Sequence, residues 1–450
     1  MKLFFVAAVV LAATALTAPA ETTFTVDFAR PSGAPLVKNR FGVYQTPLVR
    51  LERLVASLPR LREAGVQDFR YELGWGKPDA LASSQIGGVA AKPEADLAAL
   101  DPLIDGLRAL GVRPLLALGY CPDPLKSTKG WASWQDVPSD LTQWQGLCRT
   151  YADHWRAPAG APPTMYEVWN EPDLPEGKGK MFFAGTAQDY GKLYAATVAG
   201  VRQGDPAARI GGPAVAYDLS YLAPILAQPM DFASIHAYDN YQDQLANLRR
   251  SLGTRTGVPL FLTEYASFAA AGMPPDGPQS HFRAAALFFR DATRMLALAD
   301  LEKVYWAQWL DAGDSPGMGL ITWDGHRKAI FNAFKIYGKL PVNRVSVTPP
   351  ADTQGVHVLA SVEELRAGMV LWNESGTDCT VRVNFGGLPF RKGEVETSRI
   401  DAHHSSFLDD PSAEDLRVLE TTKLTGDTAN TWEGPIPAGG VVSLVTRSSE

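Results

Sequence analysis

The chain has 450 residues, of which 46% are hydrophobic and 20% charged, and it carries a net charge of −7 and three cysteines. This slightly acidic balance leaves no surplus of cations to neutralise phosphates, so nucleic acid is excluded as a partner. Three cysteines are too few for a disulfide-stapled scaffold or a multi-cysteine zinc cluster.

The N-terminal residues 1–20 have the pattern of a secretory signal peptide. Lys2 precedes an apolar run over residues 3–18, and Ala18-Pro19-Ala20 has the small-x-small form that signal peptidase cleaves. The run is shorter than the roughly 20 residues that a membrane span requires. We therefore expect cleavage after Ala20 and a secreted or periplasmic protein without membrane insertion.

The cysteines leave two alternatives in such an oxidising compartment. Cys121 and Cys148 could form a disulfide and leave Cys379 unpaired. Three buried free thiols are the other arrangement, because spacing along the chain does not show which side chains lie close together.

Between residues 41 and 341, short runs rich in β-branched and aromatic residues alternate with longer stretches of helical period. The runs lie at 41–45, 66–72, 112–119, 164–171, 208–215, 231–238, 259–266 and 303–310. The helical patterns lie at 48–64, 94–110, 141–155, 187–202, 282–299 and 329–337. Such alternation is typical of βα units around a parallel sheet, and eight strands is the number in a (β/α)8 TIM barrel. No glycine-rich dinucleotide fingerprint follows the first strand, which weakens an open doubly wound sheet. We therefore predict a catalytic barrel within residues 21–341.

After Pro341 the pattern changes to short alternating segments interrupted by turn-forming residues. They lie at 345–348, 356–361, 368–373, 379–385 and 440–447. This pattern predicts an antiparallel β-sandwich over residues 342–450. The stretch 24–28 also alternates, so residues 21–37 either add a strand to the sandwich or stay apart from it.

Polar side chains stand at the carboxyl ends of the predicted barrel strands, where the active sites of such barrels form. In strand order they are Arg70 and Glu72, Asn170 and Glu171, His236 and Tyr238, Glu264, and Trp306. Glu171 and Glu264 end the fourth and seventh strands and should meet at the mouth. Glycoside cleavage needs such a pair, one carboxylic acid for the leaving oxygen and one carboxylate for the sugar. Taken alone, Glu171 is also compatible with a structural carboxylate at a helix start.

A metal site is not predicted. The chain has seven histidines, and none forms an H-x-x-x-H or H-x-H pair. We therefore expect no metal. The carboxylate pair of the mouth needs no organic cofactor for glycoside cleavage, and it predicts an oligo- or polysaccharide as the substrate.

Three segments resemble the retaining glycosidases of clan A. They are Trp169-Asn170-Glu171-Pro172-Asp173-Leu174, Ser234-Ile235-His236-Ala237-Tyr238 and Leu262-Thr263-Glu264-Tyr265-Ala266-Ser267, the signatures of the fourth, sixth and seventh strands. The greatest likeness is to glycoside hydrolase family 39, the β-xylosidase and α-L-iduronidase family. The eighth unit around Tyr305-Trp306 and the entry to the fifth strand at 205–213 are similar too, so the resemblance spans most of residues 41–341.

The resemblance implies a role for each matching residue. Glu171 would be the general acid/base and Glu264 the nucleophile, with retention of configuration. The supporting residues would be Asn170, which binds the sugar 2-hydroxyl, Arg70, which favours the charged nucleophile, His236 and Tyr238, which orient the carboxylates, and Trp306, which floors the subsite of the cleaved sugar.

Two departures from the family pattern touch the sugar pocket. Family β-xylosidases usually carry a histidine shortly after the second-strand arginine, where this chain has Tyr71 and Glu72. They also carry an acidic pair after the eighth strand, where this chain has Asp311-Ala312-Gly313-Asp314. The reaction class is therefore better determined than the sugar.

Three functions remain open. The first is β-xylosidase-like hydrolysis of oligosaccharides, the second is endo-cleavage of a microbial exopolysaccharide, and the third is a catalytically silent carbohydrate-binding barrel. Trp131, Trp134 and Trp144 either extend the cleft as stacking platforms or hold their loop to the barrel.

Overall fold

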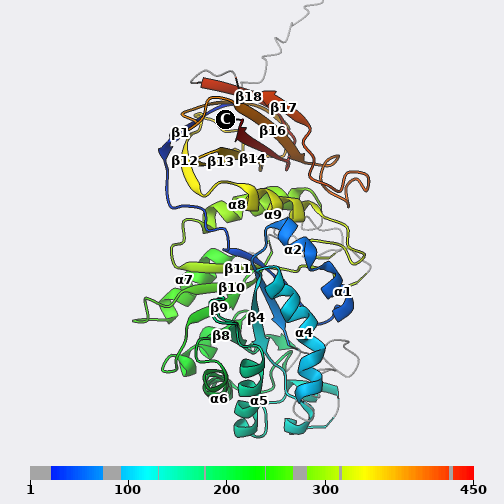
Figure 1. The fold of residues 1–450 in the computed structure, drawn as a ribbon. Coiled ribbons are helices and arrows are strands. Elements are labelled where there is room, and N and C mark those ends of the chain that lie inside the picture. The colour runs from blue at the N-terminus through cyan, green and yellow to red at the C-terminus, as the bar shows by residue number, and fades with distance from the viewer. Residues whose placement is uncertain are drawn as a thin grey trace, which may run out of the picture.

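The computed structural model describes residues 22–73, 93–129, 131–176, 179–238, 240–266, 281–313, 317–424 and 429–449. The predicted signal peptide lies outside these residues. Two units follow one another along the long axis of the molecule, a barrel and a curled sheet, with helices α8 and α9 between them (Figure 1).

The first unit is a closed barrel of eight parallel strands, which confirms the predicted TIM barrel. Every strand overlaps a predicted run. In chain order the strands are β2 (Phe41–Gln45), β3 (Asp68–Glu72), β4 (Arg113–Leu118), β5 (Met165–Val168), β8 (Arg209–Val215), β9 (Phe232–His236), β10 (Leu260–Tyr265) and β11 (Leu301–Ala307).

Helices surround the barrel. They are α1 (Leu51–Ser57), α2 (Pro59–Ala64), α4 (Pro93–Ala109), α5 (Leu141–His154), α6 (Ala187–Gly204), α7 (Tyr241–Ser251), α8 (Arg283–Met295) and α9 (Ala329–Lys339). The single helix predicted over 48–64 is divided at Leu58, because Pro59 has no N–H to continue the ladder and starts a new helix instead. Helix α7 was not predicted, since few apolar residues mark its buried face.

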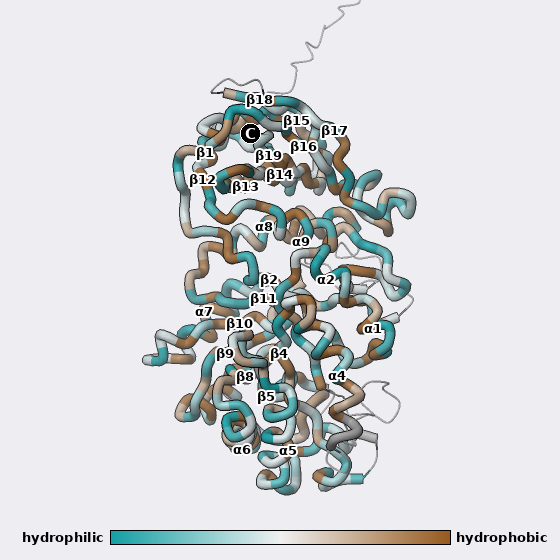
Figure 2. Tube along the Cα trace, viewed as in Figure 1, coloured by the Kyte–Doolittle hydropathy of each residue, from teal (hydrophilic) through white to brown (hydrophobic). Residues whose placement is uncertain are grey.

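Short elements complete the loops of this unit. They are the 3-10 turns η1 (Asp123–Leu125), η2 (Trp131–Gln135), η3 (Leu219–Tyr221) and η4 (Ala223–Ile225), and the two-residue strands β6 (Pro175–Glu176) and β7 (Gly179–Lys180). Hydrophobic and hydrophilic residues alternate along the outer helices, as expected for helices with one buried face (Figure 2).

The barrel interior is filled by large side chains from alternate strand positions. Phe232 and Phe261 stack there with ring centroids 4.1 Å apart. The same cluster contains Tyr44, Leu115, Met165, Tyr305 and Ala307. Below the mouth the barrel is therefore a packed core, and any ligand must bind at its open end.

The second unit is a sheet of nine strands in the order β17-β16-β19-β14-β13-β12-β1-β15-β18. Their bounds are β1 (Thr22–Pro31), β12 (Asn343–Thr348), β13 (Val356–Glu363), β14 (Arg366–Asn373), β15 (Cys379–Gly386), β16 (Gly393–Ile400), β17 (Glu420–Lys423), β18 (Ala429–Ile436) and β19 (Val441–Ser448). Edge strand β18 contacts β14, so the sheet curls over its own core as in a sandwich.

Two features of this sheet differ from the prediction. The neighbouring strands are antiparallel except for β1 and β15, which run parallel, so the sheet is mixed. Strand β1 comes from the N-terminal side of the barrel and lies between β12 and β15. Strands β16, β17 and β18 were not predicted, because exposed polar residues obscure their alternation.

A loop of the sheet, residues 401–419, is bonded to the connection between β11 and α9. Glu414 accepts from the guanidinium and the backbone N–H of Arg327, and it lies 2.8 Å from the ring of His326. Phe407 stacks on His326 with centroids 3.8 Å apart. The second unit thus supports a loop that leaves the barrel at its mouth.

The structure also bears on the predicted disulfide and on membrane-spanning helices. Cys121, Cys148 and Cys379 are buried free thiols, so the predicted alternative of a Cys121–Cys148 disulfide is wrong in this structure. Among the described residues, no helix has the length and apolar character needed to cross a bilayer.

Candidate active site

The predicted polar residues of four strand ends meet at the mouth of the barrel. Arg70 lies on β3, His236 ends β9, Glu264 lies on β10, and Glu171 follows β5. All four are at least nine-tenths buried. They meet because neighbouring parallel strands deliver their carboxyl ends to the same rim.

Arg70 organises this cluster from a fully buried position. Its Nε donates to Glu167 Oε2 at 2.7 Å, its Nη1 to Glu264 Oε1 at 2.9 Å, and its Nη2 to Asn170 Oδ1 at 2.7 Å. The guanidinium also lies 4.7 Å from the centre of the Tyr44 ring. Because a guanidinium only donates, the Asn170 oxygen must face Arg70, which leaves the Asn170 amine for another acceptor.

Glu264 is held from both sides. Arg70 bonds one of its carboxylate oxygens, and the Tyr238 hydroxyl donates to the other at 2.6 Å. Burial first, and then the charge of Glu171, raise the pKa of Glu264 to about 7, against the lowering effects of His236 and Arg70. The two donors favour the ionised form and fix its orientation.

Glu171 lies just beyond the end of β5, in backbone of unusual shape. Its φ is 41° and that of Trp169 is 66°, left-handed conformations that cost non-glycine residues about 1–3 kcal/mol. The Glu171 N–H donates to the Ala214 carbonyl at 3.0 Å, and the Trp169 indole donates to the Phe182 carbonyl at 2.8 Å. These bonds hold the strained turn and direct the Glu171 carboxyl towards the other strand ends.

The environment of Glu171 favours its protonated form. Burial, and then the charge of Asp173, raise the pKa of Glu171 to about 8, against the lowering effect of Arg70. The pKa of Glu171 therefore lies above that of Glu264. The proton is therefore favoured on Glu171, and the negative charge on Glu264, which Arg70 and Tyr238 contact.

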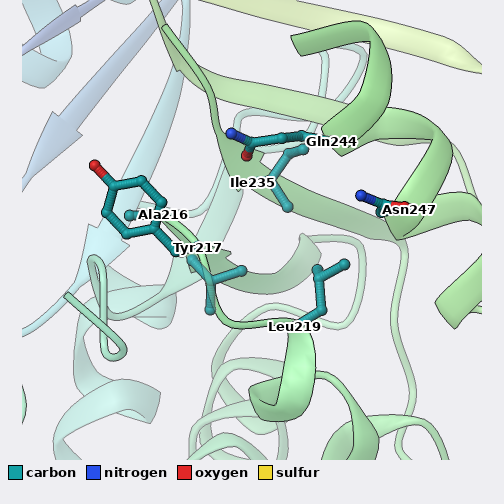
Figure 3. Close-up of a pocket in the computed structure, with 7 residues that line it drawn as sticks. Ala216, Tyr217, Leu219, Ile235, Gln244 and Asn247 are labelled. Carbon is teal, nitrogen blue, oxygen red and sulfur yellow. The ribbon is translucent and has the colours of Figure 1, made fainter. Parts of the chain in front are cut away.

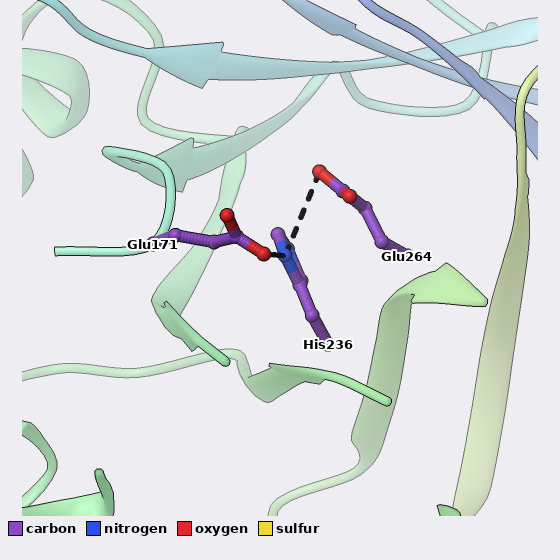
Figure 4. Close-up of side chains that lie close together, drawn as sticks. All are labelled: Glu171, His236 and Glu264. Atoms are coloured by element: carbon purple, nitrogen blue, oxygen red, sulfur yellow. Dashed lines mark hydrogen bonds and ion pairs between the residues drawn. The ribbon is translucent and has the colours of Figure 1, made fainter. Parts of the chain in front are cut away.

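His236 lies between the two glutamates (Figure 4). Its Nδ1 is 2.8 Å from Glu171 Oε1 and 3.5 Å from Glu264 Oε1. Burial lowers the pKa of His236, so the ring is neutral. Its Nε2 is buried without a hydrogen-bond partner among the described residues, so we assign the ring hydrogen to Nδ1, which faces the carboxyl groups.

The two carboxyl groups are close together. An oxygen of Glu171, an oxygen of Glu264 and a ring nitrogen of His236 all lie within 4.8 Å of one another. Such a set contains ligand types that a divalent cation accepts. The guanidinium of Arg70, 2.9 Å from Glu264, would repel a metal ion at this point.

Glu72 occupies the same mouth but points to tyrosines. The hydroxyl of Tyr44 donates to one of its oxygens and that of Tyr120 to the other, the latter at 2.8 Å. Burial raises the pKa of Glu72. The side chain is only 1% exposed. Glu72 therefore acts by holding the hydroxyls of Tyr44 and Tyr120 in place.

The structure corrects the prediction for Trp306. Neighbouring Tyr305 and Ala307 face the barrel interior, so Trp306 must face outwards. It is 1% exposed and packs against Phe288 of α8 and Phe334 of α9. Trp306 is part of the core between barrel and helices and cannot floor a sugar subsite.

The loop tryptophans also belong to the core where they are described. Trp144 is buried and donates to Thr197 Oγ1 at 2.8 Å, and Trp134 packs edge-on against Tyr120 at 5.0 Å. They hold their elements to the barrel and offer no free face for stacking. The side chain of Trp131 and residue Asp314 lie outside the described part of the chain.

Asp311 does not face the mouth as a free carboxylate. Its side chain pairs with Lys328 at 2.8 Å, and both are almost completely buried. It also accepts the Gly319 N–H at 2.7 Å. Asp311 thus closes the loop after β11.

Sequence reasoning missed two carboxylates of this site. Glu167 is fully buried on β5 and bonds Arg70, and Asp173 raises the pKa of Glu171. Strand alternation from the interior residue Met165 could have indicated Glu167. Asp173 gave no comparable signal, because its partners are backbone N–H groups of a distant loop.

Known glycoside hydrolases resemble this chain in sequence. The family model described as Glycosyl hydrolases family 39 matches residues 82–251. A β-xylosidase of Caldicellulosiruptor saccharolyticus is 25% identical over 317 residues, 61% of this chain and 63% of that protein. One of Geobacillus stearothermophilus is 29% identical over 191 residues, 38% of this chain and 36% of that protein. The chain thus spans less than two thirds of the length of these relatives.

Solved structures show the same fold. A monomeric β-xylosidase from Caulobacter crescentus CB15 has a TM-score of 0.75 at 20% identity, over 95% of this chain and 100% of that one. A family 39 enzyme from Xanthomonas axonopodis pv. citri has a TM-score of 0.74 at 20% identity, over 95% and 97% of the two chains. Together the matches confirm the resemblance predicted from the three strand-end segments.

Proposed function

From the resemblance of this chain to glycoside hydrolase family 39, we propose that it is a retaining glycoside hydrolase, β-xylosidase-like on oligosaccharides. The observation that carries the proposal is the separation of the two glutamates, whose nearest oxygens lie within 4.8 Å. Retaining glycosidases place their carboxyl groups about 5–5.5 Å apart, whereas inverting ones leave roughly 6.5–9.5 Å for a water molecule.

In the first step Glu264 attacks the anomeric carbon. The bond to the leaving oxygen breaks while Glu171 transfers its proton to that oxygen, so the leaving sugar departs as a neutral alcohol. Glu264 needs its negative charge for this attack, which Arg70 and Tyr238 favour. Because His236 bonds Oε1 of Glu171, Oε2 is the oxygen that presents the proton.

In the second step water replaces the leaving group. Glu171, now ionised, takes a proton from that water, and the resulting hydroxyl attacks the anomeric carbon and frees Glu264. Two inversions give net retention. No oxidant, metal or organic cofactor enters the balance.

The remaining polar groups bind the sugar. Arg70 holds the oxygen of Asn170, so the Asn170 amine is oriented for a sugar hydroxyl beside Glu264. In the family resemblance this is the 2-hydroxyl. A hydrogen bond there strengthens as positive charge develops on the sugar in the transition state.

The test is to trap the intermediate. A xyloside with fluorine at C2 and an activated leaving group should form a stable covalent adduct, found by peptide mass spectrometry on Glu264. NMR of xyloside hydrolysis should show the first product with the anomeric configuration of the substrate. An inverted first product would contradict the proposal, and a panel of bacterial polysaccharides tests the endo-acting alternative.

A further inference from the structure

Tyr217 is an exposed aromatic side chain next to the proposed active site. It follows β8 and is 74% exposed. Among the described residues with large, exposed hydrophobic side chains, Tyr217 is the only aromatic one. Every other described aromatic side chain is buried or half-buried, so Tyr217 alone among them offers most of its ring to solvent.

The backbone that carries Tyr217 is held firmly. The carboxylate of Asp173 accepts the N–H groups of Ala216 at 2.9 Å, Tyr217 at 2.7 Å and Asp218 at 2.7 Å. Asp173 is itself only 2% exposed. The main chain at Tyr217 is therefore fixed before any ligand arrives, so less backbone entropy is lost on binding.

Tyr217 lies on the side of the site that belongs to Glu171. The Glu171 N–H bonds the carbonyl of Ala214, three residues before Tyr217, and Asp173 is two residues after Glu171. Glu264 instead accepts hydrogen bonds from Arg70 and Tyr238. A general acid touches the leaving oxygen, so the leaving group must extend over the Glu171 side of the mouth.

A small pocket adjoins the ring (Figure 3). Its apolar walls come from the ends of β8 and β9 and from the segment after β8 that includes Leu219, and its amides come from Gln244 and Asn247 of α7. The cavity measures about 40 Å³, enough for a water molecule and too small for a sugar ring. The Tyr217 hydroxyl is directed away from Asn247. Because most of the side chain is exposed, its ring is accessible to a ligand from solvent.

We propose that Tyr217 is the stacking platform for the departing sugar, a pyranose leaving group bound beside Glu171. This inference rests on the proposed glycosidase function and adds the subsite that function requires. A pyranose presents C–H groups on its faces and hydroxyls at its edge, so one face can lie on the aromatic ring while the hydroxyls stay in water.

The position also predicts which step Tyr217 affects. The leaving sugar is present in the first transition state and gone before the second. Loss of the ring should therefore lower kcat/KM for substrates with a sugar leaving group. A glycosyl fluoride offers the same reacting sugar with a leaving group too small to stack.

The experiment compares xylobiose with β-xylosyl fluoride. In Tyr217→Ala the ratio of kcat/KM for xylobiose to that for the fluoride should fall about tenfold, which corresponds to about 1.4 kcal/mol. Tyr217→Phe keeps the stacking face and should retain nearly the wild-type ratio. Leu365→Ala removes another exposed side chain, 59% exposed on the second unit, and should not change the ratio.

The outcomes separate the two proposals. An unchanged ratio in Tyr217→Ala overturns the subsite, as does a Phe variant as impaired as the Ala variant, since that result would assign the effect to the hydroxyl. If wild-type protein hydrolyses neither substrate, the β-xylosidase-like function itself is contradicted.

Discussion

Arg70 bonds Glu264 with Nη1 and Glu167 with Nε, at 2.9 and 2.7 Å. The carboxyl groups of Glu72 and Glu171 share the same mouth. Among the residues the structure describes, Arg70 is the one permanent cation that pairs with any of these four carboxyl groups, and it pairs with two of them. One positive charge cannot compensate four negative ones in a buried site, so protons must be retained, and Glu171 retains one to about pH 8.

Arg70→Gln tests this charge balance. Loss of the guanidinium removes one of the groups that lower the pKa of Glu264, so that pKa rises. The acid limb of the kcat/KM profile should move to higher pH. The protein should also lose about 3–5 kcal/mol of stability, because Glu167 is left buried without its partner. An acid limb that stays in place while activity falls would contradict this role.

Glu264→Ala tests the nucleophile. We expect kcat to fall by about 10⁴-fold or more, because no covalent intermediate can form. Azide should restore turnover of activated aryl glycosides and give a glycosyl azide of inverted configuration. A variant with wild-type rates would disprove the assignment.

Glu171→Ala tests the acid/base. Turnover of substrates with poor leaving groups should fall by about 10²–10⁴-fold, while substrates that need no protonation keep a fast first step. Equal losses on dinitrophenyl and methyl glycosides would argue against general acid catalysis.

The pH dependence follows from the order of the two pKa values. Activity requires ionised Glu264 and protonated Glu171, so kcat/KM should form a narrow bell between pH about 7 and about 8. The folded pKa of Glu171 exceeds its ordinary 4.5, so its contribution to stability is full below that value and is lost as pH rises to about 8. Glu171→Gln should therefore raise the melting temperature relative to wild type more at pH 9 than at pH 4.5. The same difference at both pH values would refute the raised pKa.

Glu414→Ala tests the contact between the two units. It removes partners of Arg327 and His326, and we expect a loss of about 1–2 kcal/mol in unfolding free energy by urea titration. Glu433→Ala is the matched control. It breaks an exposed ion pair with Arg382 inside the sheet and should change stability by less than about 0.5 kcal/mol. Equal effects of the two variants would contradict a supporting contact.

Export is a proposal that rests on residues 1–20. In a bacterial host the mature protein should appear in the periplasm or medium, with Glu21 as its N-terminal residue by Edman degradation. Ala20→Leu should block processing and leave the longer precursor. Cytoplasmic protein that retains its first 20 residues would exclude this location.

The sequence alone was enough to predict the barrel and the acidic pair. Strand runs of period 2 between helical stretches define βα units, and residues at the ends of parallel strands must share one rim. Arg70, Asn170, His236 and Tyr238 accordingly meet at the two glutamates.

Tertiary structure decided what each side chain faces. Strand alternation assigns neighbouring residues to opposite faces without saying which face is inside. Trp306 therefore packs beneath α8 and α9, whereas Tyr305 fills the barrel. Asp173 acts on Glu171 and on the loop of Tyr217, because folding brings the ends of β5 and β8 together. Contacts between residues so far apart in the chain depend on strand register and closure, and no local pattern contains that information.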